Sequence, residues 1–152
     1  MTKEEIYKAR LVELQPLIFA LQSAIEIFGR DKARELAEAT FAKYADDRYV
    51  RDFENTPLDE RWAKFVEDIL NAADDNQYSV DLHEENMIKI RYQWCVFLEI
   101  FKKFGLEDFV PLYCETDFVT CQKVHPGINL IRTETLAMGA PYCDHCWEYA
   151  PE

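Results

Sequence analysis

Positive charge is scarce in this chain of 152 residues. Lysine and arginine together number 17 against 29 aspartate and glutamate residues, which gives a formal net charge of −12 at pH 7. Nucleic acids and anionic membrane surfaces are bound mainly through lysine and arginine. The composition therefore argues against both kinds of partner, while 49% apolar and 30% charged residues are ordinary for a soluble protein.

Several other features are missing. No apolar run approaches the roughly 20 residues that span a bilayer, and the polar start, Met1 to Glu5, does not have the pattern of a signal peptide. The chain contains no internal repeat, low-complexity tract or linker. Its length suits one domain. We therefore predict a single cytoplasmic domain over residues 1–152, with a helical part at 1–74 and a mixed part at 75–152.

The cysteine count is five, an odd number that argues against a complete disulfide framework. Cysteines of cytoplasmic proteins act as thiols, metal ligands or nucleophiles, or are simply small buried apolar residues. Four of the five, and two of the three histidines, lie between Cys114 and Trp147. This segment is the first place to look for a site.

Apolar residues at helical spacing predict helices in the first half of the chain. The predicted helices cover residues 3–29, 31–46 and 57–73, with a charged connection at 47–56. Thr2 and Glu5 match a capping box and Gly29 a helix stop. Pro16 predicts a kink or a division into two helices.

After residue 77 the apolar period changes from helical to alternating. Alternation predicts a hairpin of strands at 78–82 and 88–92, and two further strands at 128–136 and 142–149. Helical patterns lie between them at 94–104, 106–113 and 115–123. The predicted fold class is α+β: a helical N-terminal half packed on an antiparallel sheet of about four strands.

Cys143 and Cys146 form a C-x-x-C motif within the last predicted strand. A zinc ribbon needs a second such motif, which the chain lacks. In a strand the two side chains point to opposite faces, which also disfavours a redox pair. A looser metal site remains open, built from Cys114, Asp117, His125, Cys143 and His145.

Cys114 and Asp117 are three residues apart and share one face of a predicted helix. Arg132 lies in an otherwise apolar strand and needs a partner. Its guanidinium either forms a salt bridge, to Asp117, Glu134 or Asp144, or grips a substrate carboxylate as a fork.

Four motifs together have a familiar pattern. Cys95 leads into a helix that ends at Phe104-Gly105-Leu106, and Cys114-x-x-Asp117 follows. Next come Leu130-x-Arg132-Thr133-x-Thr135-Leu136-x-x-Gly139 and Tyr142-Cys143-Asp144. Over residues 75–147 this pattern resembles the L-2-amino-thiazoline-4-carboxylic acid hydrolase family. His145 and Cys146 depart from it, because the family has an aromatic and a basic residue there.

The resemblance implies a hydrolase that opens a cyclic amidine, acting on a C–N bond other than a peptide bond. Water attacks the thiazoline ring and gives N-carbamoyl-L-cysteine. From residue types and spacing we assign catalytic roles to Cys143, Asp117 and Asp144, and substrate-binding roles to Arg132, Thr133 and Cys114. We expect no cofactor or a divalent metal of unknown identity, for which Cys114, Asp117, Cys143 and His145 are the candidate ligands.

Two other functions fit the same residues. One is a non-catalytic small-molecule or metal-binding module, such as a sensor. The other is a thiol-redox protein that uses Cys143 and Cys146. The hydrolase and the binding module both have a small molecule as the expected partner. Leu11 and Ile18 of the first helix form either a homodimer face or part of the core.

Overall fold

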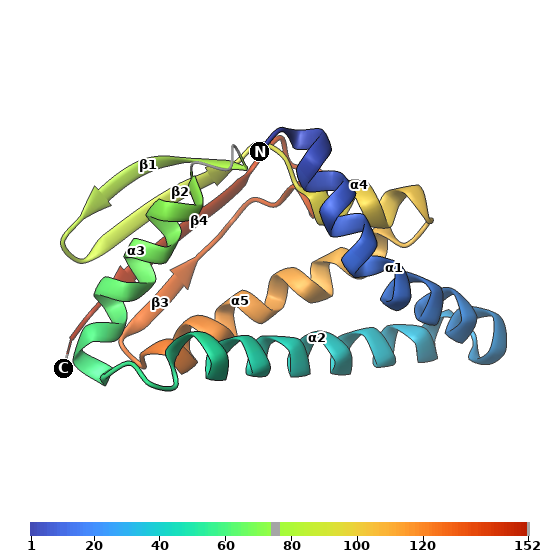
Figure 1. Ribbon diagram of the computed structural model, residues 1–152, viewed down its shortest axis with the longest axis horizontal. Coiled ribbons are helices and arrows are strands. Elements are labelled where there is room, and N and C mark those ends of the chain that lie inside the picture. The colour runs from blue at the N-terminus through green and yellow to red at the C-terminus, as the bar shows by residue number, and fades with distance from the viewer. Residues whose placement is uncertain (74–76, 152) are drawn as a thin grey trace.

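The computed structural model describes residues 1–73 and 77–151, so the predicted boundary at residue 74 lies outside the described residues. Among these residues, long helices fill the first half of the chain, and two strands, two helices and two further strands follow (Figure 1). In chain order they are α1 (Lys3–Phe28), α2 (Arg30–Phe53), α3 (Arg61–Ala73), β1 (Tyr78–Glu84), β2 (Met87–Tyr92), α4 (Val96–Lys103), α5 (Val110–Val124), β3 (Ile128–Ile131) and β4 (Cys143–Tyr149). Short 3-10 turns precede α3 and α5 and separate β3 from β4: Leu58–Glu60, Glu107–Phe109 and Leu136–Met138.

The four strands form one sheet in the order β1-β2-β4-β3, and each neighbouring pair is antiparallel. The predicted α+β class is therefore confirmed. One face of the sheet is buried against helices, whereas Lys89 and Arg91 on the opposite face of β2 are exposed. The buried face is made by Ile88, Ile90, Ile128, Leu130, Cys143, His145 and Trp147.

The first helix begins and ends where the sequence predicts. Thr2 and Glu5 form the capping box. Gly29 has a φ of 87°, a backbone angle that residues other than glycine rarely adopt. Pro16 lies inside one continuous helix, which excludes the second of the two predicted alternatives, a division into two helices. Gly29 is at the sharp turn from which α2 returns along α1.

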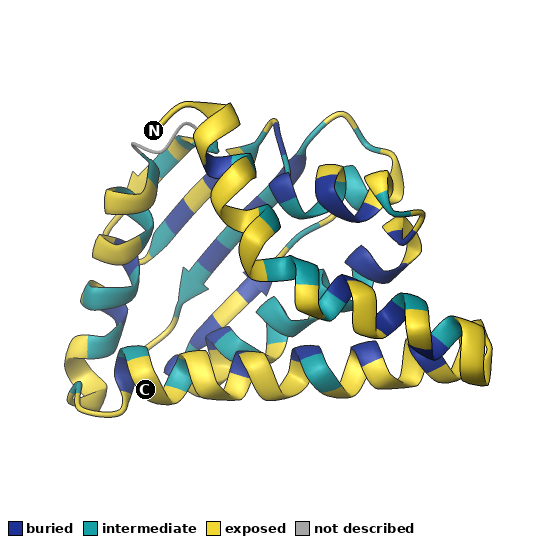
Figure 2. Ribbon diagram, turned by 45° about the vertical axis from the view of Figure 1, so that its right-hand side comes forward, coloured by how far each residue is buried: buried dark blue, intermediate teal, exposed yellow. Residues whose placement is uncertain are grey.

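The predicted charged connection at 47–56 is wrong for most of its length, because α2 continues to Phe53. Two ion pairs at helical spacing support this last part: Asp47–Arg51 at 3.3 Å and Arg48–Asp52 at 3.6 Å. Figure 2 shows the buried residues of α2 recurring along one side of the helix. Because α2 extends to Phe53, Arg48 and Arg51 lie on a helix beside the sheet and not in a loop.

The buried apolar residues fall into two clusters (Figure 2). The helical cluster joins α1, α2, α4 and the start of α5, with Phe101 and Phe109 at its centre. The sheet cluster packs α3 and the rest of α5 on the buried face of the sheet, around Ile88 and Trp147. Polar groups lie between the two clusters and form the candidate site.

Helix α1 is long and apolar enough to cross a membrane by length and composition alone, so the prediction that no segment reaches that limit is wrong. Core helices of soluble proteins meet the same criterion, and α1 packs on α2 and α4. Ile18 is fully buried and Leu11 packs against the helical cluster. Ile18 is therefore a core residue and not part of a dimer face, whereas Leu11 is half-buried and its place in a homodimer stays a prediction.

Two further predictions are corrected near the site. The helices predicted at 106–113 and 115–123 are a 3-10 turn and one continuous α5, with Pro111 in its first turn. The strand predicted at 128–136 ends at Ile131. Beyond it, the backbone N–H groups of Thr133 and Glu134 donate to the Asp144 carboxylate, which replaces the hydrogen bonds of a strand.

Candidate functional site

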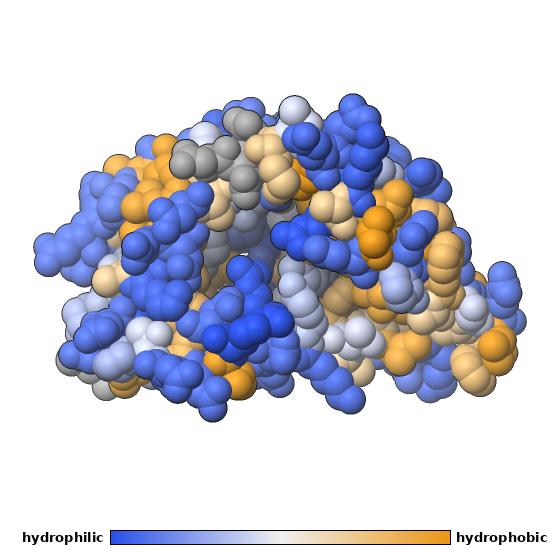
Figure 3. Space-filling model, viewed as in Figure 1, coloured by the Kyte–Doolittle hydropathy of each residue, from blue (hydrophilic) through white to orange (hydrophobic). Residues whose placement is uncertain are grey.

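Two adjoining cavities lie between the helical cluster and the sheet cluster. The thiol cavity, of about 380 Å³, is lined by Cys95, Cys114 and Cys143 among others. The aromatic cavity, of about 240 Å³, is lined by Phe53, Trp147 and other rings. They share six lining residues, namely Arg48, Asp52, Gln77, Tyr92, Asp117 and His145. Figure 3 shows this face hollowed between the sheet with α3 on one side and α1 with α4 on the other.

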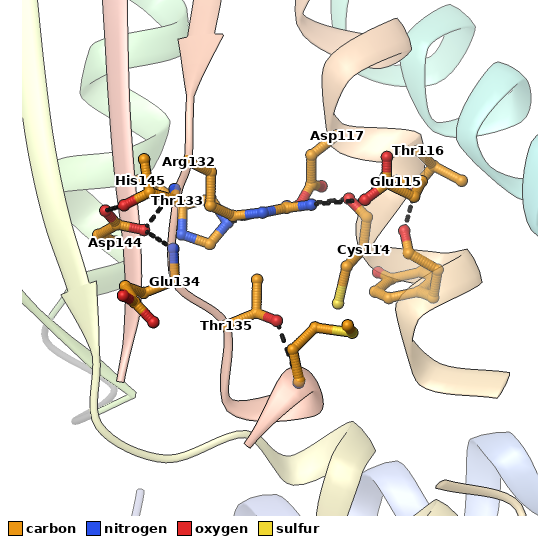
Figure 4. A network of polar contacts seen from close by, with 12 residues as sticks. Cys114, Glu115, Thr116, Asp117, Arg132, Thr133, Glu134, Thr135, Asp144 and His145 are labelled. Carbon is orange, nitrogen blue, oxygen red and sulfur yellow. Dashed lines mark hydrogen bonds and ion pairs between the residues drawn. The ribbon is translucent and has the colours of Figure 1, made fainter. Parts of the chain in front are cut away.

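The polar centre of the site is Arg132, Asp117 and His145. Arg132 extends from the segment after β3 toward α5 (Figure 4), and its Nη1 lies 3.0 Å from Asp117 Oδ2. His145 Nε2 lies 3.5 Å from both of these groups. The imidazole of His145 reaches Asp117 and Arg132 from β4. The pairing of His145 with Ile90 fixes its place in the sheet, and the packing of α5 on β3 brings Asp117 to it.

One atom in this centre has no partner. Within the described residues, Nδ1 of the buried His145 side chain makes no hydrogen bond. The ring is held between Tyr92 and Trp147, with ring centroids 5.2 and 5.3 Å away. Buried polar atoms are almost always satisfied, so this unpartnered nitrogen, in a residue that lines both cavities, marks His145 as a candidate functional group.

Phenol groups add donors to the same cavities. Burial raises the pKa of Tyr92 and Tyr113 far above that of free tyrosine, so both phenols stay protonated at neutral pH. Neither hydroxyl group hydrogen-bonds to another of the described residues. Each can therefore donate to a bound molecule.

The three thiols of the thiol cavity are protonated at neutral pH. Burial raises the pKa of Cys114 to about 12 and that of Cys95 to about 11, and it also raises the pKa of Cys143. Cys143 Sγ accepts a hydrogen bond from the N–H of Leu136 at 3.2 Å. None of the three has the lowered pKa that marks an activated thiol.

These thiols predict a loss of stability in alkali. Between about pH 8.5, where unfolded cysteine ionises, and the raised folded pKa, the unfolded chain loses protons that the folded chain keeps. Stability due to the buried thiol is complete below that range and falls as the pH rises. For Cys114 we expect a loss of about 1–2 kcal/mol at pH 10 relative to pH 8.

Urea unfolding at the two pH values measures this loss. Cys114→Ala should show a shallower decline with pH than the wild-type protein. Cys146→Ala, which changes a half-exposed thiol on the outer face of the sheet, should stay close to the wild-type decline. Equal slopes for wild type and Cys114→Ala would contradict a buried, protonated Cys114.

The six residues predicted from the sequence are divided among three places. Cys114, Asp117 and Cys143 line the thiol cavity, which brings the predicted Cys114–Asp117 face and Cys143 together. Arg132 and Thr133, with Cys114, line a separate outer groove of about 510 Å³. Asp144 lines none of these cavities.

The outer groove is larger than the thiol and aromatic cavities, yet its chemistry is less suited to an anionic substrate. The Arg132 side chain is only 3% exposed, and its donors are directed at the Cys114 carbonyl, Asp117 and Glu115. The groove also exposes Glu115 and Glu134, whose charge repels a carboxylate. His145 and Asp117 are not among the residues that line it.

Asp144 holds the segment that carries Arg132. Its carboxylate accepts the N–H groups of Thr133 and Glu134 and the hydroxyl of Thr133, at 2.6–2.9 Å (Figure 4). Partial burial raises its pKa, but these hydrogen bonds outweigh burial and hold the pKa below the ordinary value. The carboxylate is thus fully used by the protein.

The metal ligands suggested by the sequence do not form a metal-binding group. Within the described residues, no three His, Cys, Asp or Glu side chains are arranged to hold a metal ion. Asp117 is paired with Arg132, and Cys114 and Cys143 keep their protons. His145 instead belongs to the Asp117 centre.

Sequence reasoning missed Arg48, Tyr92 and Tyr113 as site residues and saw His145 only as a metal ligand. Tyr92 carried a usable signal, since it alternates with Ile88 and Ile90 and therefore shares their buried face. Arg48 gave none, because it lies in a charged run with no apolar period.

The fold and the cavities define an α+β protein with a polar, thiol-lined cavity of the size that takes a small molecule. The family model described as L-2-amino-thiazoline-4-carboxylic acid hydrolase matches residues 5–147, so the chain belongs to this family. The match confirms the resemblance and extends it over the N-terminal helices. Comparison with curated proteins gives no match.

Proposed function

We propose that the protein is a hydrolase that opens the ring of a small cyclic amidine bearing a carboxylate, such as L-2-amino-thiazoline-4-carboxylate. The observation that carries this proposal is the buried imidazole of His145, which lies beside Asp117 in a small-molecule cavity and keeps one nitrogen unpartnered. Membership of the family supports the substrate class.

In this proposal His145 is the general base. With its proton on Nε2, directed at Asp117, the ring has a free lone pair on Nδ1 that can take a proton from water. Asp117 then stabilises the positive charge on the imidazole. Arg132 is a positioning residue, because its guanidinium holds the Asp117 carboxylate 3.0 Å away.

The bonds made and broken follow from the substrate and product. The oxygen of water bonds to C2 of the thiazoline ring, and the C2–S bond breaks. The ring nitrogen keeps C2 as its carbamoyl group. Of the two protons of the water, one passes through His145 to the departing sulfur, which leaves as a thiol, and the other ends on the ring nitrogen. C–S scission therefore replaces the C–N scission expected from the sequence. One water molecule is consumed.

The phenol groups suit the polar ring. Tyr92 and Tyr113 can donate hydrogen bonds to a ring nitrogen or to the oxygen that forms on C2, where charge develops. Both rings are held by neighbours: Tyr92 against His145, and Tyr113 stacked on Phe97 at 4.5 Å. Donors fixed in this way need no reorganisation during the reaction.

The nucleophile predicted from the sequence, Cys143, provides a sharp test. Because its pKa is raised and its sulfur accepts from Leu136, we expect water to attack directly. Cys143→Ala should then lower kcat by less than about tenfold, since it removes only a lining group. A loss of 10³-fold or more, together with a covalent adduct on the wild-type protein, would make Cys143 the nucleophile.

The function itself is tested with the purified protein and L-2-amino-thiazoline-4-carboxylate. Turnover should release one thiol per substrate, detected with a thiol reagent, and a product heavier by one water in mass spectrometry. Heat-denatured protein serves as the blank. Tight binding of the substrate with no product would instead support the non-catalytic binding module.

A further inference from the structure

Arg48 lies where the two cavities meet the surface. It projects from α2, lines both cavities, and has a side chain that is 56% exposed. Among the residues that the structure describes, it is the only lysine or arginine in the wall of both cavities. A molecule that reaches His145 from this side passes its guanidinium.

The guanidinium of Arg48 makes one long ion pair within the protein, with Asp52. Its nearest carboxylate, that of Asp52, is 3.6 Å away, beyond hydrogen-bonding distance. No hydrogen bond joins Arg48 to another of the described residues. Arg132 is the opposite case, since its donors go to Asp117, Glu115 and the carbonyl of Cys114. Arg48 thus keeps its hydrogen-bond donors available for a ligand where the two cavities meet.

Two further arginines lie near Arg48 at the mouth of the thiol cavity. Arg10 from α1 and Arg51 from α2 also line the mouth of the thiol cavity. Each is paired with an acidic neighbour on its own helix, Glu13 and Asp47. Asp52 likewise lies beside Arg48, so the charges at this opening are balanced, and attraction of an anion depends on the free hydrogen-bond donors of Arg48.

We propose that Arg48 binds the carboxylate of the substrate and thereby sets the specificity of the site for anionic ring compounds. A planar guanidinium matches a carboxylate with two parallel hydrogen bonds. With the carboxylate at the mouth, the ring lies inward toward Tyr92 and His145. This assignment rests on the proposed function, and it moves the carboxylate-binding role from Arg132 to Arg48.

Binding without turnover tests the proposal. The probes are 2-aminothiazole-4-carboxylate, whose aromatic ring resists addition of water, and its uncharged 4-carboxamide, both titrated by calorimetry. Wild-type protein should bind the acid at least about tenfold more tightly than the amide, because a charge-assisted pair is lost in the amide. Arg48→Gln should lose at least about tenfold in affinity for the acid and less than twofold for the amide.

Two comparisons keep the result unambiguous. Retained amide binding shows that Arg48→Gln folds with its cavity intact. Lys43→Gln makes the same charge change on α2 at an exposed position that lines neither cavity, and it should leave the preference for the acid unchanged.

The outcomes separate this proposal from the proposed function. A wild-type preference for the acid that survives in Arg48→Gln overturns the role of Arg48, even if the protein turns over its substrate. A preference that disappears in Arg48→Gln supports that role, even if no turnover is found. With turnover, Arg48→Gln should raise KM at least about tenfold and change kcat little, as expected for an anchor distant from the reacting carbon.

Discussion

Replacing His145 by glutamine is expected to lower kcat by about 10²–10⁴-fold, the contribution typical of a general base. Glutamine keeps a polar side chain of similar length between the rings of Tyr92 and Trp147. It cannot take a proton from water, however. The loss should therefore fall on kcat, with KM for the thiazoline substrate changed by no more than a few-fold.

His83→Gln is the matched control. It makes the same chemical change at an exposed position on β1, remote from the cavities. Steady-state kinetics of both variants, with circular dichroism to show that they fold, complete the experiment. Wild-type kcat in His145→Gln would remove the imidazole from the mechanism and leave the direct Cys143 attack as the remaining hypothesis.

His145 shows what the sequence could and could not predict. Helical and alternating periods located α1, α3 and the hairpin of β1 and β2, because each pattern reports the burial of one face. The spacing of Cys114 and Asp117 placed both in the thiol cavity. The contact of His145 with Asp117 depends on the register of β4 with β2 and on how α5 packs on the sheet. Both are non-local and leave no short motif.

The two largest errors in the fold have a common physical cause. The end of α2 is held by ion pairs such as Asp47–Arg51, which leave no apolar period. The segment at Thr133 and Glu134 continues an alternating pattern, yet a side chain, Asp144, takes its backbone hydrogen bonds. In both places polar side chains replace the burial signal that sequence patterns report, and both places border the candidate site.

Asp117→Asn is expected to lower the free energy of unfolding by about 2–3 kcal/mol, even though asparagine has the same shape. The reason is Arg132, whose side chain is 3% exposed and would keep its charge after losing its closest carboxylate. Removing one partner of a fully buried ion pair costs about 3–5 kcal/mol. The cost is smaller here, because the Asp117 side chain is 38% exposed and is partly screened by water, and because the Cys114 carbonyl and Glu115 still accept from Arg132.

Glu115→Gln removes the other carboxylate and is the matched comparison. The Glu115 side chain is 70% exposed and lies 3.3 Å from Arg132, so water already screens this pair. Its loss should cost less than about 1 kcal/mol. Urea unfolding of the two variants gives both values under the same conditions.

A double variant separates the buried charge from the lost contacts. Arg132→Met combined with Asp117→Leu removes both charges and should be more stable than the sum of the two single effects predicts, as found when buried ion pairs are replaced by apolar residues. The same double variant should lack turnover, because Asp117 no longer stands beside His145. If Glu115→Gln proved more destabilising than Asp117→Asn, the pair of Arg132 and Asp117 would not be the one that holds the centre of the site together.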